Sequence, residues 1–480
     1  MKTRTNESAQ SSGSDYSRTV TAEGDQRDRA HDQERTIEDT AGSESSLALK
    51  NMRGVVILVV MGFHSVLAYL AFLGPTAFSF DRSPYEWRAF PIIDSHRWIG
   101  FDVLCASQDV YLMALMFFLS ALFTWPSLSR KGTRKFVIDR LLRLGVPFVF
   151  ALTVVVPLAL YPVYRVSAVD PSVAAYVHHY LALPFWPNGP MWFLWQLLAL
   201  TIVAAGVHRF APRSIEFLGR LSSSANARPG RYLVALIIAS AIAYVPLALA
   251  FTPFAWSERG PFALQLSRPL LDAVFYFAGL GVGAYGIERG LLAARGMLAR
   301  RWHVWLALAL VFLVLWMGLT SLVLNNAASA PLALRAGVDI CFAAACASGC
   351  FFMLAICLKF GTARSRILDQ FSTNAFALYL LHYIFVVWLQ YALLGVELFA
   401  VAKASLVFGG TLLLALAMSN AMRFSRFGSL LIGEQPIVSN ITPARVLVFE
   451  NENNNCNRET AGRTLPDTNW PPTRPKTKCP

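Results

Sequence analysis

The sequence predicts an all-α polytopic membrane protein with about ten transmembrane helices. The chain has 480 residues, of which 55% are apolar and only 15% are charged, whereas charged residues make up about a quarter of an ordinary soluble domain. Its mean hydropathy is +0.47. Apolar runs long enough to cross a bilayer follow one another with short loops between them, and such runs span membranes as helices. One helical bundle between two polar tails accounts for the chain, and membrane lipid is an expected partner.

Ten apolar runs are the expected spans, and each needs about 20 residues to cross the hydrocarbon core as a helix. Proline and glycine inside several runs are compatible with a bundle, where neighbouring helices satisfy the freed backbone groups. The expected spans cover approximately residues 53–73, 108–125, 145–164, 190–207, 231–252, 269–286, 303–324, 335–358, 371–392 and 399–421.

The two ends of the chain differ in composition from the spans. Residues 1–50 are rich in Ser, Thr, Asp, Glu, Arg and Gln and contain almost no aromatic residues, as disordered tails do. Residues 426–480 begin with an apolar stretch and then become polar. We expect a disordered cytoplasmic tail over 1–50, a transmembrane domain over 51–425 and a polar, disordered tail over 426–480.

The distribution of Lys and Arg predicts the orientation of the bundle. Loops after even-numbered spans carry eighteen of these residues and loops after odd-numbered spans carry seven, so the positive-inside rule places the even loops and both termini in the cytoplasm. The same distribution explains the net charge of +13, because the basic residues alternate with spans. They do not cluster on one soluble module, so no nucleic acid partner is expected.

Two expected outer loops, 74–107 and 165–189, are aromatic and polar. Such loops cover an outward-facing mouth that takes a large polar acceptor, or they form the aromatic belt common to membrane proteins. The sequence leaves both interpretations open.

His64 is the candidate catalytic residue. It lies eleven residues inside the first run, Arg53 to Leu73, and so close to the expected midplane, where an ionisable side chain is costly and indicates function. A structural interpretation remains, because a buried histidine also hydrogen-bonds neighbouring helices.

Arg140 and Arg143 are the candidate acyl-CoA-binding residues. They lie three residues apart at the cytoplasmic border of the third span, where α-helical spacing places both on one face. Arginine binds phosphate through paired N–H donors, which suits the pyrophosphate and 3′-phosphate of coenzyme A. Ordinary positive-inside charge explains the same residues equally well.

Three further residues are secondary candidates for the site. His382 lies eleven residues into the ninth run, where a neighbouring tyrosine could hold it as a structural residue. Asp272, near the outer end of the sixth run, could orient a hydroxyl or a histidine, although acids at helix ends commonly just extend to the interface. Arg53 opens the first run, eleven residues before His64.

No metal site is expected from the sequence. Four of the seven cysteines lie inside a single apolar helix, at positions 341, 346, 350 and 357, where a thiol serves as a small apolar packing group. The segment GVGAYG, Gly281 to Gly286, matches a dinucleotide-binding pattern literally. It ends an apolar span and follows no strand, so a small-residue packing face that includes Gly279 and Gly283 is the better interpretation.

Five segments together resemble the acyltransferase-3 family of integral membrane proteins. Arg53-Gly54 and Phe63-His64-Ser65 match the opening helix of that family, with its arginine and histidine eleven residues apart. The other segments follow in the family's order: MFFLSALFTWPSLSRKG (116–132), FVIDRLLRLGVPF (136–148), GPMWFLWQLLAL (189–200) and NAFALYLLHYIFVVW (374–388). The resemblance covers about residues 50–425 and is greatest to the bacterial branch that includes the periplasmic-glucan succinyltransferases.

The resemblance implies a ten-helix enzyme of the bacterial inner (plasma) membrane. Such an enzyme moves an acyl group from cytoplasmic acyl-CoA to a hydroxyl, commonly of an extracytoplasmic carbohydrate, with acyl-CoA as co-substrate and no bound cofactor. By the same match His64 corresponds to the family's essential histidine, and Arg140 with Arg143 to its R-x-x-R. The chain departs at Lys50, where the family often has an acid three residues before the Arg-Gly pair.

These expectations lead to a mechanism and to a competing class. Acyl-CoA docks from the cytoplasm, and His64 either removes the proton of the acceptor hydroxyl or is acylated first. Desolvation favours the neutral imidazole that both routes require. The competing class is a transporter or glycan exporter that uses His64 as a proton relay. We detect no internal repeat, and the phosphate-suited arginine pair has no obvious role in transport.

Overall fold

The computed structural model describes residues 44–74, 78–288, 290–326 and 329–433. These residues belong to one compact unit. Residues 1–43 and 434–480 lie outside the described part of the chain, so the disorder expected for them stays a prediction.

The fold is all-α, as predicted. Nine helices in the described residues are long and apolar enough to cross a membrane: Glu44–Tyr69, Ile99–Lys131, Thr133–Ser167, Gly189–Phe210, Pro229–Phe251, Trp302–Asn325, Leu332–Phe360, Arg366–Ala392 and Ala400–Arg423. A tenth apolar helix, Pro269–Tyr285, is shorter, at 17 residues. Each helix overlaps one predicted run, because a chain in lipid must satisfy its backbone hydrogen bonds within the helix itself.

Several of these helices consist of shorter elements. The first span ends in a 3-10 turn, η1, and the third span alternates α and π segments. The described elements are η1 (Leu67–Tyr69), η2 (Glu86–Arg88), α2 (Ile99–Ala121), α3 (Thr124–Lys131), α4 (Thr133–Arg140), η3 (Leu141–Gly145), α5 (Val146–Phe150), η4 (Ala151–Val155), α6 (Val156–Ser167), α7 (Val173–Leu181), η5 (Gly189–Met191), α8 (Trp192–Phe210), α9 (Pro212–Ser223), α10 (Pro229–Phe251), β1 (Trp256–Arg259), β2 (Phe262–Gln265), α11 (Pro269–Tyr285), α12 (Met297–Arg300), α13 (Trp302–Asn325), α14 (Leu332–Phe360), α15 (Arg366–Ala392), α16 (Ala400–Arg423) and α17 (Arg426–Leu431).

The predicted start of the first span was wrong. The helix begins at Glu44, so residues 44–50, which the composition assigns to the tail, are helical. Ala48 and Leu49 are buried there, and the three apolar residues 47–49 among polar ones are too short a pattern to mark a helix. The middle of the helix therefore moves towards its N-terminus, and His64 lies closer to the C-terminal end than to the centre.

The predicted start of the second span was also too late. Helix α2 begins at Ile99, nine residues before position 108. Its first turn carries Asp102, whose carboxylate accepts hydrogen bonds from the backbone N–H groups of Ala71 and Phe72. The hydrogen bonds of the Asp102 carboxylate are thereby satisfied within the fold.

The predicted boundary at residue 426 needs a similar correction. Residues Arg426–Leu431 form the short helix α17, and the hydroxyl of Ser425 caps it by accepting from the N–H of Gly428. Ile432, directly after the helix, is fully buried. The apolar stretch at the start of the expected tail is therefore part of the bundle.

Two π-helical segments, η3 and η4, interrupt the third span. Each lies just before a proline, Pro147 or Pro157. Proline donates no N–H, and its ring crowds the carbonyl four residues earlier, which falls inside the π segment in both cases. The wider turn accommodates that clash, and it changes which side chains share a helix face.

Small residues allow close packing of α11 against α2. A Cβ atom at Gly279 or Gly283 would overlap the carbonyl oxygen of Phe118 or of Leu122. The packing interpretation of these glycines is confirmed.

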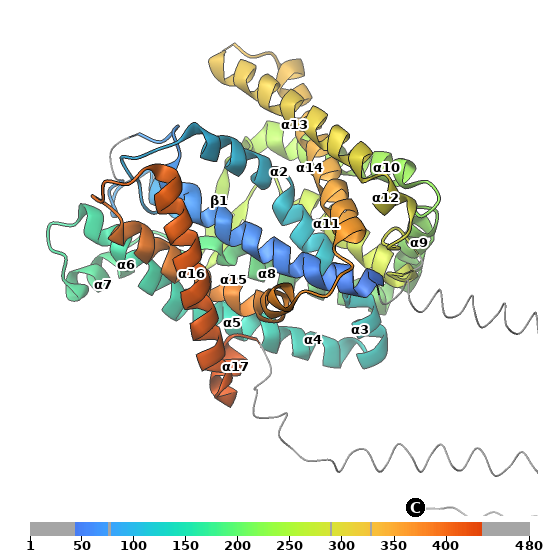
Figure 1. Ribbon diagram of the computed structural model, residues 1–480, viewed down its shortest axis with the longest axis horizontal. Coiled ribbons are helices and arrows are strands. Elements are labelled where there is room, and N and C mark those ends of the chain that lie inside the picture. The colour runs from blue at the N-terminus through green and yellow to red at the C-terminus, as the bar shows by residue number, and fades with distance from the viewer. Residues whose placement is uncertain (1–43, 75–77, 289, 327–328, 434–480) are drawn as a thin grey trace, which may run out of the picture. The chain divides into compact units, whose positions relative to one another are not determined.

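In Figure 1 α13 lies at the edge of the bundle beside α14. The most apolar stretch of α13 has no buried residues, as expected for a helix that faces lipid.

Candidate active site

The backbone of the first span determines which nitrogen of the His64 imidazole carries the hydrogen. The imidazole Nδ1 lies 2.9 Å from the carbonyl oxygen of Val60, one turn earlier. A carbonyl only accepts hydrogen bonds, so Nδ1 carries the hydrogen and Nε2 keeps its lone pair. The side chain is half-buried, which leaves that nitrogen available to a reactant.

His382 has the same arrangement on α15. Its Nδ1 lies 2.7 Å from the carbonyl oxygen of Tyr379, so its Nε2 is also the basic nitrogen. The side chain is fully buried, and Nε2 has no hydrogen-bond partner among the described residues. A buried polar atom without a partner is costly and is found at functional sites more than elsewhere.

The two imidazole rings contact each other. Their centroids lie 4.9 Å apart with an angle of 62° between the ring planes. The first span and α15 are joined here by Gln390, whose side-chain amide donates to the carbonyl oxygen of His64 at 2.9 Å. The structure therefore brings together the primary candidate His64 and the secondary candidate His382.

Tyrosines and a glycine turn complete one wall of this site. Tyr383 lies 6.3 Å from His64, centroid to centroid, and the hydroxyl of Tyr379 donates to the carbonyl oxygen of Pro190 in η5. Gly189 has a positive φ of 48°, and a Cβ there would lie 2.8 Å from the ring of Tyr383. Only glycine meets both demands, so the GPMW turn is specifically shaped to lie against the histidine site.

Helix α7 covers this wall. Tyr180 on α7 lies close enough to Tyr383 for the two hydroxyls to interact electrostatically. Burial raises the pKa of the Tyr180 hydroxyl above its ordinary value, so this group stays protonated and can donate a hydrogen bond. Its oxygen has no partner among the described residues.

The arginine candidates form a positive cluster beside the N-terminal half of the first span. Arg53 lies inside the helix that begins at Glu44, so the prediction that Arg53 opens this helix was wrong. Arg53 lies close enough to Arg140 for the two charges to repel, and Arg140 likewise interacts with Arg143. The guanidinium of Arg53 lies 4.3 Å from the ring centroid of Phe123. The structure thus adds Arg53 to the predicted pair, a proximity that no spacing in the sequence indicates.

The expectation that Arg140 and Arg143 share one α-helical face needs correction. The π segment η3 begins directly after Arg140 and contains Arg143, and its wider turn shifts the direction of the second side chain. Arg140 is half-buried beside the ring of Phe136, with 5.1 Å between its guanidinium and the ring centroid, whereas Arg143 is exposed. The two charges are neighbours with different surroundings.

A basic cavity of about 580 Å³ lies next to this cluster on the α3–α4 corner. It is lined by Lys131, Gly132, Thr133, Arg134, Lys135 and Ile138. Asp139, the acid beside Arg140 in sequence, forms an ion pair with Lys131. Lys50 occupies the position where members of the family that this sequence resembles often have an acid. Its Nζ forms an ion pair with the carboxylate of Asp369 at 2.6 Å.

Asp272 belongs to a different group of residues. It is buried and accepts a hydrogen bond from the side-chain amide of Gln196 at 2.9 Å. Arg268 and Asp109, which form an ion pair with each other, act on it electrostatically. The described partners of Asp272 thus join α2, α8 and α11, and they include neither histidine of the site.

Sequence reasoning identified His64 and His382 but not the contact between them, nor Gly189 and Gln390 beside them. Two of the segments that resemble the family contain Tyr379, Tyr383 and Gly189. The tyrosines and the glycine beside apolar runs are the sequence feature that could have indicated these residues. Nothing in the sequence indicates that Gln390 contacts His64, because a single amide in an apolar helix can hydrogen-bond to any of several neighbouring helices.

Comparison with known proteins agrees with the geometry. A family model described as an acyltransferase domain matches residues 46–420, which is most of the chain and includes both histidines and all three arginines. Among curated proteins and solved structures, none matches the chain. The chain belongs to the acyltransferase-3 family, and it is a multi-pass membrane acyltransferase.

Proposed function

We propose that this protein transfers an acyl group from cytoplasmic acyl-CoA to a hydroxyl of an extracytoplasmic carbohydrate. The observation that carries the proposal is the His64 imidazole, whose Nδ1–H is bound to a backbone carbonyl while Nε2 is left as a base. Such a base is what attack of a hydroxyl on a thioester requires.

The arginine cluster supports coenzyme A as the donor. Arg53, Arg140 and Arg143 place three positive charges near one another, and guanidinium groups bind phosphate through charge-assisted hydrogen bonds. Arg53 and His64 are eleven residues apart on one helix, or about 16 Å at the α-helical rise. The extended pantetheine arm bridges such a distance, so phosphates at the arginines leave the thioester near His64.

The reaction balances with the groups of the site. His64 Nε2 takes the proton of the acceptor hydroxyl as its oxygen attacks the thioester carbonyl. The carbon–sulfur bond breaks, and the imidazolium returns the proton to the departing thiolate, which leaves an ester and free CoA. The alternative in which Nε2 is acylated first uses the same lone pair.

His382 supports His64 in this scheme. Its basic Nε2 is buried beside the His64 ring, where it can share the positive charge or proton that forms on His64. Because a desolvated charge is costly without a partner, a second imidazole lowers the free energy of the protonated intermediate.

The orientation of the bundle and the acceptor also belong to the proposal. The loops rich in Lys and Arg support a cytoplasmic arginine end by the positive-inside rule, and the family resemblance supports a bacterial inner membrane. The opposite end, under α7, then receives the acceptor. The sequence resemblance to periplasmic-glucan succinyltransferases suggests a glucan-like acceptor. The proton-relay exporter is less well supported, because the family match is to acyltransferases.

Thioester cleavage by the purified full-length chain tests this function. Free CoA is measured with a panel of acyl-CoAs of increasing chain length and charge, with and without soluble β-glucan as acceptor. We expect glucan-dependent release of CoA from at least one donor, and acyl groups recovered on the glucan. Release that is equal without glucan, or no release from any donor, would contradict the proposal.

A further inference from the structure

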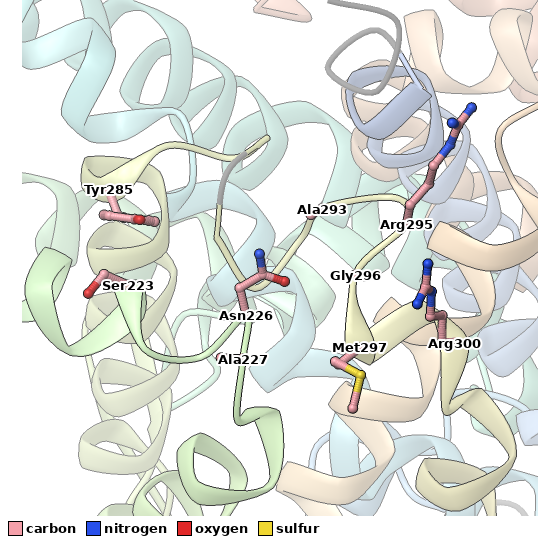
Figure 2. Close-up of a pocket in the computed structure, with 9 residues that line it drawn as sticks. All are labelled: Ser223, Asn226, Ala227, Tyr285, Ala293, Arg295, Gly296, Met297 and Arg300. Carbon is pink, nitrogen blue, oxygen red and sulfur yellow. The ribbon is translucent and has the colours of Figure 1, made fainter. Parts of the chain in front are cut away.

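A second cavity, of about 510 Å³, lies away from the histidine site. It is lined by Ser223, Asn226, Ala227, Tyr285, Ala293, Arg295, Gly296, Met297 and Arg300. Figure 2 shows Arg295 and Arg300 on one side of the cavity, Ser223 and Tyr285 on the other, and Asn226 between them. The lining residues come from the ends of several elements and from the segment between α11 and α13.

The ends of three membrane helices place this cavity at the depth of lipid headgroups. Helix α11 ends at Tyr285, α10 begins at Pro229, and α13 begins at Trp302, two residues after Arg300. Tryptophan at the start of a membrane helix is typical of the interface between headgroups and acyl chains. The packing of α9 and α3 against α11 puts the cavity at the same end of the bundle as Arg53 and Arg140.

Helix α9 has the pattern of a helix that lies along the membrane surface. Ile215 and Gly219 face the bundle, where a Cβ at Gly219 would contact Ala284. Phe217 and Leu221, one turn apart on another face, are 60% and 44% exposed. The helix that contributes Ser223 to the cavity therefore also offers exposed apolar side chains to lipid tails.

The charges of the cavity suit an anion. Arg295 is held by Glu44, with 2.9 Å between guanidinium nitrogen and carboxylate oxygen. Arg300 is exposed, and no ion pair joins it to a carboxylate in the described part of the chain. A guanidinium that lines a polar cavity and lacks an acidic partner is suited to bind phosphate.

We propose that this cavity binds the phosphodiester headgroup of an anionic phospholipid, with Arg300 as its main charge contact. Basic cavities between membrane helices on the cytoplasmic side bind such headgroups, and the apolar face of α9 receives the acyl chains of the same lipid. The site lies apart from both histidines, and it does not depend on the proposed acyl transfer.

Binding of pyrene-labelled phosphatidylglycerol to the purified full-length chain in neutral-detergent micelles tests this site. Arg300→Gln removes the charge and should weaken binding about tenfold, the loss expected for one charge-assisted contact. Arg300→Lys keeps the charge without the planar fork and should fall between the two. Arg300 is exposed, so neither change removes a buried contact, and equal unfolding temperatures of the variants in detergent verify this.

Arg213→Gln is the matched control, because Arg213 is exposed on α9 and does not line the cavity. It should leave lipid binding unchanged. If Arg213→Gln weakened lipid binding as much as Arg300→Gln does, the effect would come from general surface charge and the site would be overturned. Lipid binding by Arg300→Gln as strong as that of the wild type would overturn it as well.

Competition separates the lipid from other phosphates. Unlabelled phosphatidylglycerol should displace the labelled lipid, whereas phosphatidylcholine, inorganic phosphate and CoA at the same concentration should not. Displacement by CoA would assign the cavity to the nucleotide of the donor, and displacement by phosphate alone would leave a simple anion site. Either result overturns the lipid proposal.

Discussion

The rings of His64 and His382 lie 4.9 Å apart, although more than three hundred residues separate them in the chain. Each has its Nδ1–H bound to a backbone carbonyl of its own helix. Both basic nitrogens are therefore Nε2, and the two imidazoles contact each other between the first span and α15.

Replacing His64 should remove acyl transfer and preserve the fold. His64→Gln keeps much of the size and some of the hydrogen bonding but has no basic nitrogen, so we expect a loss of about 10²- to 10⁴-fold in kcat. Acyl transfer measured beside the thermal unfolding temperature separates the two effects. A folded His64→Gln enzyme with most of its activity would make His64 a structural residue.

His382→Gln should reduce kcat by up to about 100-fold, because the positioning and charge of His64 change while its own base remains. The KM for acyl-CoA should stay the same, since the arginine cluster is untouched. The pH dependence of kcat should also shift, because His382 no longer shares the charge on His64. A change in KM with an unchanged pH profile would argue for a packing role alone.

Arg140→Ala should raise the KM for acyl-CoA about 10- to 100-fold, through loss of a charge-assisted contact worth about 1.5–3 kcal/mol. Arg53→Ala and Arg143→Ala should each raise it less, because both side chains are exposed whereas Arg140 is half-buried. Arg143→Lys should restore part of the loss. Arg130→Ala is the control for general positive charge. Unchanged acyl-CoA binding in all three alanine variants would assign these residues to topology.

The ion pair of Lys403 with Asp94 should matter for stability more than any surface pair. Nζ lies 2.7 Å from the carboxylate, and both side chains are almost fully buried. Lys403→Met removes the cation from the buried carboxylate of Asp94, which among the described residues keeps only its contacts with His96, and should cost about 3–5 kcal/mol. The double variant Lys403→Met, Asp94→Leu should recover much of this loss.

Thermal unfolding in detergent measures these changes. The control is Lys50→Met, because the exposed pair of Lys50 with Asp369 should contribute about 1 kcal/mol or less. Equal destabilisation by Lys50→Met and Lys403→Met would contradict the argument from burial.

Single-cysteine labelling tests the orientation. In a background without the seven native cysteines, a membrane-impermeant maleimide should label position 178 on α7 in intact cells. Position 131, beside the arginine cluster, should be labelled only after permeabilisation. The reverse pattern would separate the proposed coenzyme site from its cytoplasmic supply and overturn acylation across the membrane.

The sequence by itself determined the membrane class, the ten helical runs, the candidate histidine and the candidate arginines. These follow from composition and from the cost of ionisable groups in lipid, both of which act locally along the chain. Helix starts were less accurate. Three apolar residues, 47–49, are too few to mark a helix. Asp102 looks like a loop residue in the sequence, because the backbone N–H groups that bind its carboxylate are known only from the fold.

Only the tertiary structure decided which of these residues lie together. Contact between His64 and His382, the close approach of Gly189 to Tyr383 and the proximity of Arg53 to Arg140 join helices far apart in sequence. Helix periodicity specifies the face of a side chain within one helix, but not the neighbour that packs on that face. Asp272 is a further example. Its position near a helix end in the sequence is compatible with an active-site role, but in the fold its neighbours are Gln196 and Arg268.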